Sequence, residues 1–294
     1  MTTITRPSTG RRPSRSSRWL GARGAVNIVL VGFAILAVYP FAVMAFGGFK
    51  SPGELTSNPG GLPQSPTFAN FIALFTGATG AQMWRALFNS VIVAIPFTAL
   101  TVLLCAMAGY AFARYKFRGR GVLFAILIAS MLVPAEVNIP SLYLFFAQID
   151  WLNSYQVQIL PGTASVLGMF MARQFMAGIP GEVLEAARVD GAGHWRTFWQ
   201  VALPMSTPVL GAIAVLTFVA KWSEYLWPRI MVSDPDYQPV MVLLPALSTG
   251  ADGYIVHYEI LLAGALVITL PLLLIFLRYQ DKLMAGTTAG AVRG

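Results

Sequence analysis

Residues 87–113 read LFNSVIVAIPFTALTVLLCAMAGYAFA and contain no charged side chain. A helix rises about 1.5 Å per residue, so a run of this length is sufficient to cross a hydrocarbon layer of roughly 30 Å. Pro96 lies inside the run, and proline is tolerated in a membrane helix because neighbouring groups or water satisfy the backbone that it frees. The run therefore predicts a helix that spans a membrane.

Five further apolar segments of similar length predict additional spans. They are residues 25–46, 122–147, 156–176, 206–228 and 259–277. The segment 156–176 is the weakest, because Pro161, Gly162 and Gly168 interrupt it. The first segment is longer than the roughly 7–15 apolar residues of a cleaved signal peptide, so we interpret it as a retained helix. The sequence thus predicts an all-α polytopic membrane protein with six transmembrane helices over residues 25–279, between a disordered tail (1–24) and a C-terminal tail (280–294).

The composition of the whole chain agrees with this interpretation. Of its 294 residues, 56% are hydrophobic and 11% are charged, and the mean hydropathy is +0.65. A soluble protein carries charge on roughly 25% of its residues, so a soluble globular fold is excluded. The single cysteine, Cys105, excludes an intrachain disulfide framework.

The cations are distributed unevenly along the chain. The sequence has 20 Lys and Arg against 12 Asp and Glu, a net charge of +8. Most of the cations lie in the two tails, in residues 114–120 and in the connection after the fourth segment, all on one side of the predicted membrane. Lys and Arg collect on the cytoplasmic side of membrane proteins. Both termini are therefore predicted to be cytoplasmic, and a nucleic-acid partner is excluded.

Motifs for catalysis are absent from the sequence. It contains no G-x-x-x-x-G-K-[ST] loop, so the chain is not itself a P-loop ATPase, and it has no H-E-x-x-H or C-x-x-C motif. Its two histidines, His194 and His257, fall on opposite sides of the predicted membrane, so they cannot share a metal. We expect no enzyme activity, cofactor or metal in this chain. A secondary carrier or channel is the alternative kind of transporter, and it would not need an ATPase.

Residues 180–204, PGEVLEAARVDGAGHWRTFWQVALP, form an unusual connection between the fourth and fifth segments. Glu182 and Glu185 lie in the first turns of a predicted helix, where the helix dipole favours carboxylates. Gly191 can take the left-handed conformation that ends a helix, so a helix–turn–helix is expected. This element could lie on the membrane surface as an amphipathic helix. Its mixed charges and modest apolar face favour protein docking instead.

The same residues resemble the EAA loop of ABC-importer permeases, which spans residues 181–204 in this sequence. The matching positions are Glu185, Ala186, Ala187, Asp190, Gly191, Ala192, Phe198, Leu203 and Pro204. Further residues are similar to the MalG-like carbohydrate branch of that family, namely Phe49-Lys50, Asn89-Ser90, residues 110–114, residues 222–228 and residues 286–294. Ser223 departs from the branch, which usually has Asn there.

The resemblance implies a division of labour among several chains. This chain would form half of a pore with a second permease subunit as a heterodimer in a bacterial inner membrane, and would import a sugar or related polyol. A cytoplasmic ATPase dimer would hold ATP and Mg, and an extracytoplasmic binding protein would deliver the solute. The C-terminal residues 288–294 would reach between the ATPase subunits. The ATPase-coupling residues would be Glu182, Glu185, Ala186, Ala187, Arg188, Asp190, Gly191 and Ala192.

Few ionisable residues lie inside the predicted spans. Lys221 and Glu224 are spaced to pair on one helix face. Intramembrane charges usually face a bundle interior or a water-filled cavity. Together with Glu136, Trp222 and Tyr225, they are the candidate lining of a translocation path. The aromatic residues could instead form an interfacial belt, and Glu136 could be a buried, structurally paired carboxylate.

The connection at residues 229–258 is longer than a minimal loop. Unsupported loops beyond roughly 12–15 residues are usually functional or disordered. The resemblance implies that this connection contacts the binding protein, with Asp234, Asp236 and Asp252 as candidate contacts. A solvated loop is the alternative.

Overall fold

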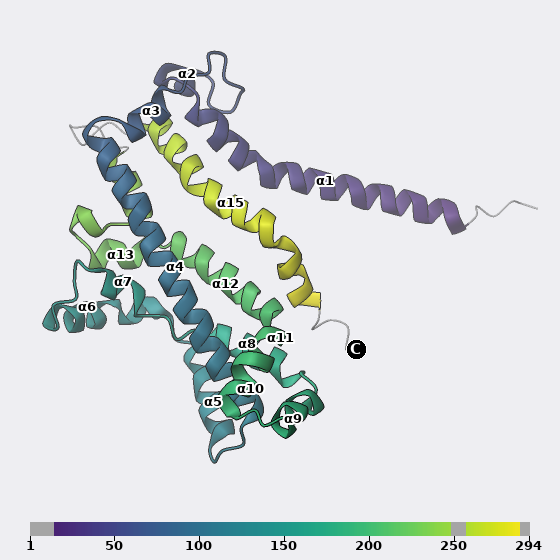
Figure 1. Ribbon diagram of the computed structural model, residues 1–294. Coiled ribbons are helices and arrows are strands. Elements are labelled where there is room, and N and C mark those ends of the chain that lie inside the picture. Colours follow the sequence, from purple (N-terminus) through teal and green to yellow (C-terminus); the bar gives the residue numbers. More distant parts are fainter. Residues whose placement is uncertain (1–14, 248–256, 289–294) are drawn as a thin grey trace, which may run out of the picture.

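The computed structural model describes residues 15–247 and 257–288, and every regular element in these ranges is helical (Figure 1). This confirms the all-α prediction for the described part of the chain. The helices are α1 (Arg15–Gly48), α2 (Pro52–Ser57), α3 (Ala69–Phe75), α4 (Gly77–Arg114), α5 (Arg120–Ser130), η1 (Ala135–Asn138), α6 (Ile139–Gln148), α7 (Tyr155–Ile159), α8 (Val166–Ala177), α9 (Gly181–Val189), α10 (His194–Thr197), the π-helical η2 (Phe198–Ala202), α11 (Leu203–Met205), α12 (Thr207–Trp222), α13 (Leu226–Met231), η3 (Pro235–Tyr237), α14 (Val240–Leu247) and α15 (Tyr258–Thr288).

Three of the described helices are long and apolar enough to cross a membrane. They lie within α1, α4 and α15, at Val26–Gly48, Gly80–Arg114 and Tyr258–Tyr279. Two bent pairs of helices raise the number to five if each pair is one span. The described residues therefore contain three to five candidate spans, and six spans stay a prediction.

The third predicted segment, residues 122–147, is broken rather than continuous. The axis turns by 87° between α5 and the η1–α6 pair. Pro134 directly precedes η1, and a residue before proline is biased away from helical geometry, which places the break at this point. The fifth segment is also interrupted, because α12 ends at Trp222 and α13 begins at Leu226.

The fourth predicted segment, residues 156–176, is not a single helix. Its two helices, α7 and α8, are separated by a turn in which Gly162 has a φ of +82°. The longer one, α8, has 12 residues, which span about 18 Å at 1.5 Å per residue. The break thus coincides with Pro161 and Gly162, the interruptions that are visible in the sequence.

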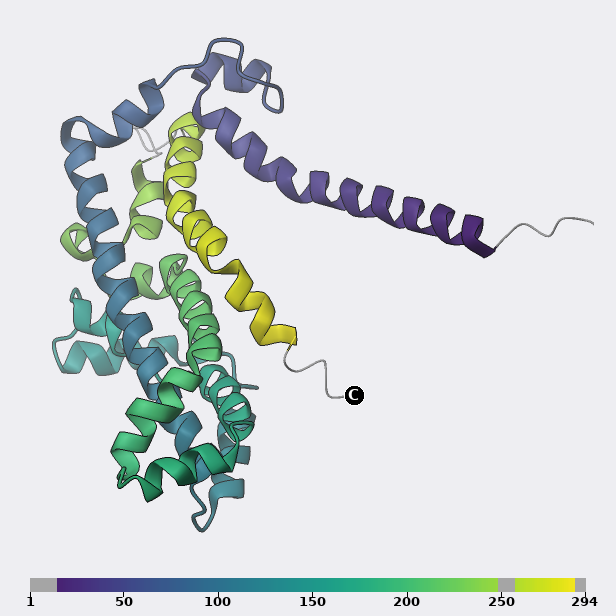
Figure 2. The ribbon, with the colours of Figure 1, turned by 45° about the vertical axis from the view of Figure 1, so that its right-hand side comes forward.

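The first helix, α1, diverges from the rest of the chain in both ribbon views (Figures 1 and 2). Residues 26–41 are exposed, and the helix packs against α15 only near its C-terminal end. It begins at Arg15, so residues 15–24 of the predicted disordered tail continue the helix. At the other terminus, α15 continues to Thr288 through much of the predicted C-terminal tail. Residues 1–14 and 289–294 lie outside the described residues.

Helix α4 lies at the centre of the fold, packed against α8 and α12. The two helices α4 and α8 lie close together at Gly109, where a Cβ atom would lie 2.6 Å from the Cβ of Ala172 and 2.9 Å from the backbone nitrogen of Arg173. One turn earlier, the buried Cys105 packs against Gly168, so the cysteine serves as a small core residue.

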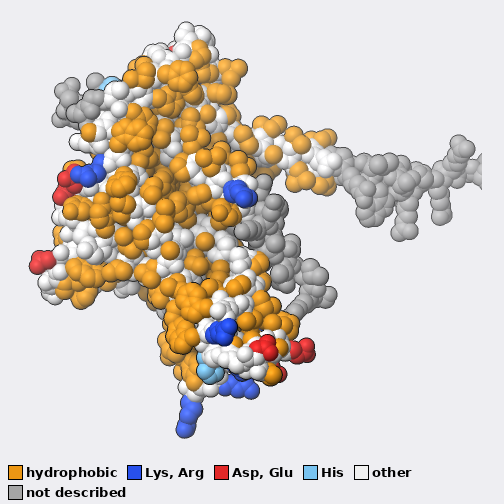
Figure 3. Space-filling view, viewed as in Figure 1, with side chains coloured by type: hydrophobic (Ala, Val, Ile, Leu, Met, Phe, Trp, Pro, Cys, Tyr) orange, Lys and Arg blue, Asp and Glu red, His pale blue; other side chains and the backbone are white. Residues whose placement is uncertain are grey.

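Hydrophobic side chains cover most of the surface in Figure 3, and charged side chains gather at the end that carries α9 and α10. This end of the molecule is called the inner end below. The opposite side of the bundle, where η3 meets α4, is called the outer end.

The close approach at Gly109 yields a prediction about stability. Gly109→Ala should force α4 and α8 apart, because two of the nearest atoms belong to the α8 backbone, and overpacking of this kind costs about 1–3 kcal/mol. The apparent Tm of the detergent-purified chain should fall. Gly121→Ala is the matched control, since nothing lies within 4 Å of a Cβ there. Equal Tm values for the two variants would contradict the assignment of this contact.

Candidate coupling site, path and outer loop

The predicted helix–turn–helix is present at the inner end. Helix α9 starts directly after Pro180, and the turn to α10 contains Gly191 at a φ of +85°. Glu182 lies in the first turn of α9 and Arg188 in the last, the arrangement that the helix dipole favours. The local geometry therefore agrees with the prediction made from the sequence.

The side chains of α9 divide into an anchor and an exposed surface. Leu184 is buried in the cluster that contains Tyr110 and Phe198, and it fixes the helix to the bundle. Val189 is 87% exposed at the C-terminal end of the helix. The predicted coupling residues are exposed or half-buried around this anchor: Glu182, Glu185, Ala186, Ala187, Arg188, Asp190, Gly191 and Ala192. No described residue of this chain covers that surface.

Arg114 fixes the segment that leads into α9. It lies in the last turn of α4, and its Nη2 donates hydrogen bonds to the carbonyl oxygens of Met176, at 2.6 Å, and Ile179. Carbonyls at a helix C-terminus lack intrahelical partners and carry partial negative charge, so a guanidinium is well matched to them. The sequence alone marks Arg114 only as a loop cation and part of the family resemblance. Its role depends on a contact 65 residues along the chain.

A cavity of about 360 Å³ lies beside this junction, between the inner end of α4 and α10. Its walls are mainly aromatic, and Tyr110 contacts both Tyr115 and Phe198 edge-on or tilted. The lining residues are Met107, Tyr110, Ala111, Tyr115, His194, Trp195 and Phe198. The ring of His194 packs against that of Tyr115, with the ring centroids 5.7 Å apart.

The predicted pairing of Lys221 with Glu224 is confirmed. Lys221 Nζ lies 2.6 Å from Glu224 Oε2, and the lysine side chain is 5% exposed against 35% for the glutamate. The ammonium also lies 4.4 Å from the centroid of the Phe97 ring on α4. Because α12 ends at Trp222, the pair bridges a helix end rather than following one helix face. Tyr225, just beyond, is exposed.

The prediction that Trp222 lines a path needs correction. Its side chain is 4% exposed and belongs to a core cluster of this chain. The indole Nε1 donates a hydrogen bond of 3.1 Å to the carbonyl of Ile268, and the ring stacks on Phe218. Trp222 therefore fastens α12 to α15. Its position in an apolar helix with other aromatic residues could not distinguish this role from a path-lining one.

Glu136 lies in η1, at the bend between α5 and α6, and is exposed in the chain. No ion pair joins it to another residue in the part of the chain that the structure describes. The alternative of a buried, paired carboxylate is therefore not what the structure has at this position.

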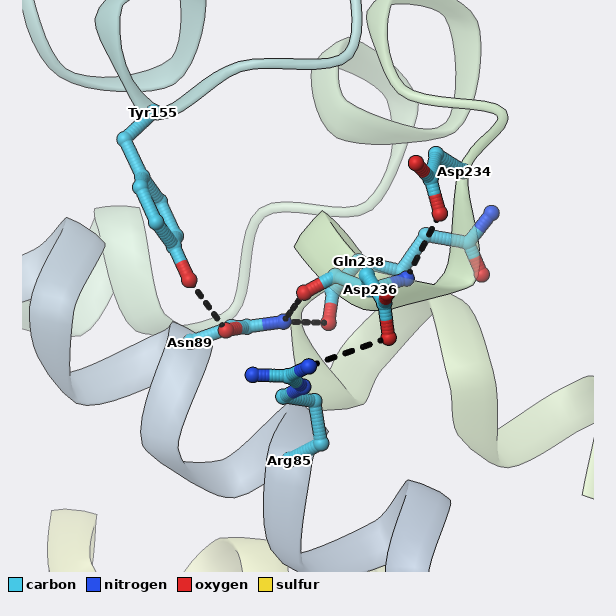
Figure 4. A network of polar contacts seen from close by, with 6 residues as sticks. All are labelled: Arg85, Asn89, Tyr155, Asp234, Asp236 and Gln238. Carbon is cyan, nitrogen blue, oxygen red and sulfur yellow. Dashed lines mark hydrogen bonds and ion pairs between the residues drawn. The ribbon is translucent and has the colours of Figure 1, made fainter.

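The outer loop, defined as residues 232–240, is held to α4 by a buried amide (Figure 4). Asn89 is fully buried, and its Nδ2 donates to the carbonyls of Asp236 at 2.9 Å and Gln238 at 3.0 Å. Tyr155 from α7 donates its hydroxyl to Asn89 Oδ1 at 2.7 Å. Through these three hydrogen bonds Asn89 joins α4, α7 and the outer loop.

Other polar side chains complete this attachment. Asn153 Oδ1 accepts hydrogen bonds from the backbone nitrogens of Ser233 and Asp234. Ser90 Oγ accepts from the backbone nitrogen of Val240 at 2.9 Å, and Gln158 Nε2 donates to the carbonyl of Tyr237. The sequence signal for these residues is limited to the polar pair Asn89-Ser90 near the start of an apolar run.

The predicted acidic contacts differ in their surroundings. Asp236 is exposed and lies 3.3 Å from Arg85, so part of its charge is balanced within the chain. Asp234 caps η3 by accepting a hydrogen bond from the nitrogen of Asp236. Asp252 lies outside the described residues.

Comparison with known proteins identifies relatives across most of the chain. The family described as "Binding-protein-dependent transport system inner membrane component" matches residues 102–286. The arabinooligosaccharides transport system permease protein AraQ of Halalkalibacterium halodurans is 32% identical over 274 residues, covering 91% of this chain and 96% of the relative. The diacetylchitobiose uptake system permease protein NgcG of Streptomyces coelicolor is 31% identical, covering 91% and 88%.

Among solved structures, a chain of a bacterial ABC transporter involved in the import of alginate superposes with a TM-score of 0.78 at 21% identity. The match covers 92% of this chain and 99% of that chain, and it shows that the two share a fold. The relatives are named as permease proteins of transport systems, which agrees with the absence of catalytic motifs. The chain belongs to the family of binding-protein-dependent transport system inner membrane components, and it is a non-catalytic permease component of an ABC transporter.

Proposed function

We propose that the chain is one of two permease subunits of an ATP-driven importer for a sugar or related polyol, and that it couples to a separate ATPase dimer through α9. The single observation that carries this proposal is the exposed surface of α9, which is anchored by Leu184 and covered by none of the described residues of its own chain. The solute class rests on the relatives, whose names refer to arabinooligosaccharides and diacetylchitobiose.

The composition of α9 suits docking into a groove of another protein. The side chains of Ala186 and Ala187 are single methyl groups, so the backbone of a partner can approach the helix closely. Charged hydrogen bonds to the partner can come from the exposed side chains of Glu182, Glu185 and Arg188. ATP and Mg belong to the ATPase, because this chain has no phosphate-binding loop.

Helix α1 supports a second membrane subunit. None of the 18-residue apolar window within Val26–Gly48 is buried against the rest of the chain. The exposed apolar surface of such a helix must be covered by lipid, by another membrane protein or by both. A second permease subunit in the same membrane would cover part of it. With α1, α4 and α15 as full spans and the broken segments as further ones, we propose six spans and cytoplasmic termini.

The outer loop is the proposed contact for a solute-binding protein, with Asp234, Asp236 and Asp252 as candidate residues. Its attachment to α4 gives a partner a fixed surface to recognise. A second structural neighbour is a bacterial alginate ABC transporter in complex with an alginate pentasaccharide-bound periplasmic protein, which is consistent with docking on this side. Lys221, Glu224, Tyr225 and Glu136 are the remaining candidates for the translocation path.

The docking of α9 can be tested by cross-linking. Val189→Cys introduces an exposed thiol, whereas the native Cys105 is buried and should not react. In the complete complex, a short bis-maleimide should join Val189→Cys to an ATPase subunit that carries a cysteine in its docking groove. Leu62→Cys is the control, because Leu62 is 68% exposed but lies in the loop after α2, away from the inner end. Absence of a cross-link from Val189→Cys in a complex that hydrolyses ATP would contradict the proposal.

The geometry of the turn after α9 yields a second prediction. Gly191→Val should strain the turn, since Gly191 has a φ of +85° that β-branched residues rarely adopt. Binding-protein-stimulated ATP hydrolysis should fall roughly fivefold or more, in line with a coupling energy of about 1–3 kcal/mol. Glu185→Lys should have a comparable effect by reversing a charge on the docking surface.

The matched control is Gly193→Val, because Gly193 has a φ of −68° and open space around its Cβ position. This variant should keep stimulated hydrolysis near the wild-type level. If Gly191→Val and Gly193→Val behaved alike, the turn angle would not matter for coupling.

A third prediction separates structure from transport at the Lys221–Glu224 pair. Glu224→Ala alone leaves a buried ammonium without its carboxylate and should lower stability by roughly 1–3 kcal/mol, measured by thermal unfolding. The double variant Lys221→Met/Glu224→Ala should recover most of that stability, because neither charge is then left unpaired. If the pair belongs to the path, solute uptake should stay low in the double variant. Wild-type uptake in the double variant would assign the pair a purely structural role.

A further inference from the structure

Helix α4 carries two polar attachments, one within its first half and one at its C-terminal end. Asn89 and Ser90 face the outer loop, 12 and 13 residues after the start of α4 at Gly77, and Arg114 is its last residue. Figure 1 shows α4 running through the bundle to the end that carries α9 and α10. The two attachments are about 38 Å apart at 1.5 Å per residue. They hold two different segments, the outer loop and the segment that leads into α9, to one helix.

The outer attachment leaves the loop little freedom to move without α4. Asn89 is fully buried, and both of its amide hydrogens are used on loop carbonyls, those of Asp236 and Gln238. Ser90 adds a bond from the backbone nitrogen of Val240, at the start of α14. Buried hydrogen bonds are costly to break without replacement, so the loop and α4 should move as one unit.

The inner attachment has the same character. Arg114 donates to the carbonyl of Met176, in the last turn of α8, and to that of Ile179, just after the helix, and Pro180 and α9 follow directly. The close contact of Gly109 with the α8 backbone fixes the two helices along their length as well. We therefore expect a displacement of α4 to reach the start of α9.

Between the two attachments, α4 is one continuous helix from Gly77 to Arg114, and Pro96 does not end it. This continuity contrasts with the breaks between α5 and η1 and between α12 and α13. A packed, unbroken helix can transmit a displacement over its length, whereas a broken one can absorb it.

We propose that α4 acts as a strut that passes engagement of the outer loop by the binding protein to the start of α9, with Asn89 within the helix and Arg114 at its C-terminal end as the positioning residues. This inference rests on the proposed function, because it takes the outer loop and α9 as the two docking surfaces. It adds the route between them and names the side chains that fasten each end.

The test is a double-variant cycle in the reconstituted complex with its ATPase. The measured quantity is the stimulation ratio, the rate of ATP hydrolysis with saturating solute-loaded binding protein divided by the rate without it. Asn89→Ala and Arg114→Ala should each lower this ratio roughly two- to thirtyfold, the range for substitutions that modulate coupling. The stimulation ratio of the double variant should equal that of the single variant with the lower ratio, because both changes interrupt the same strut. Fold-changes that multiply in the double variant, or an unchanged ratio in either single one, would overturn the inference.

Two further variants distinguish transmission through α4 from a general loss of rigidity in the outer loop. Asn153→Ala removes bonds to the same outer loop but touches neither α4 nor α8, so its ratio at saturating binding protein should stay near wild type. Arg114→Lys keeps the charge but has fewer and less rigid donors, so its ratio should lie between those of wild type and Arg114→Ala. A fall in Asn153→Ala as large as that in Asn89→Ala would assign the effect to loop rigidity alone.

Assembly is checked by co-purification of the ATPase with each variant. If Asn89→Ala does not assemble, Ser90→Ala replaces it in the cycle, because it removes one acceptor and little volume. Failure of the proposed function would look different from failure of the strut. In the first case the Val189→Cys variant would form no cross-link to the ATPase and the wild-type complex would show no stimulation. In the second case both would be observed, and the effects of Asn89→Ala and Arg114→Ala would multiply.

Discussion

Backbone groups that are buried outside regular helices must find hydrogen-bond partners within the chain, because an unpaired buried polar group is costly. The breaks in this fold are satisfied by side chains placed for that purpose. Asn89 binds two carbonyls of the outer loop, and the indole of Trp227 donates to the carbonyl of Val157. Lys50, which is fully buried, donates to the carbonyls of Asn58 and Gly61. These contacts fasten the irregular segments to the neighbouring helices, and the surfaces available to partners depend on them.

Two surfaces of the chain have no cover within the described residues, and they differ in chemistry. Most of α1 is apolar on every side, which suits lipid and a second membrane subunit. The surface of α9 combines charged side chains with the small side chains of alanine, which suits a groove in a soluble protein. The catalytic chemistry that the sequence lacks can thus reside in partners, while this chain supplies attachment points and a rigid frame between them.

The apolar runs and the turn at Gly191 were predictable from the sequence because they depend on local composition and local backbone preference. The position of the break at Pro161 and Gly162 was visible for the same reason. The bend of 87° after α5 was not, since its angle is set by packing. The pairing of Lys221 with Glu224 followed from a spacing of three residues. The contacts of Asn89 and Arg114 join residues 149 and 65 positions apart and could not be read from spacing. Trp222 was misassigned because exposure to a path and burial in a core have the same sequence pattern.

The most direct test of the account is uptake of the binding protein's own solute into proteoliposomes, measured with and without the ATPase dimer. The account predicts that uptake requires this chain, its partner permease, the ATPase, internal ATP and the binding protein together. Omission of the ATPase, or its replacement by a variant that cannot hydrolyse ATP, should abolish uptake. Solute accumulation that persists without the ATPase would show a self-contained carrier and contradict the central claim.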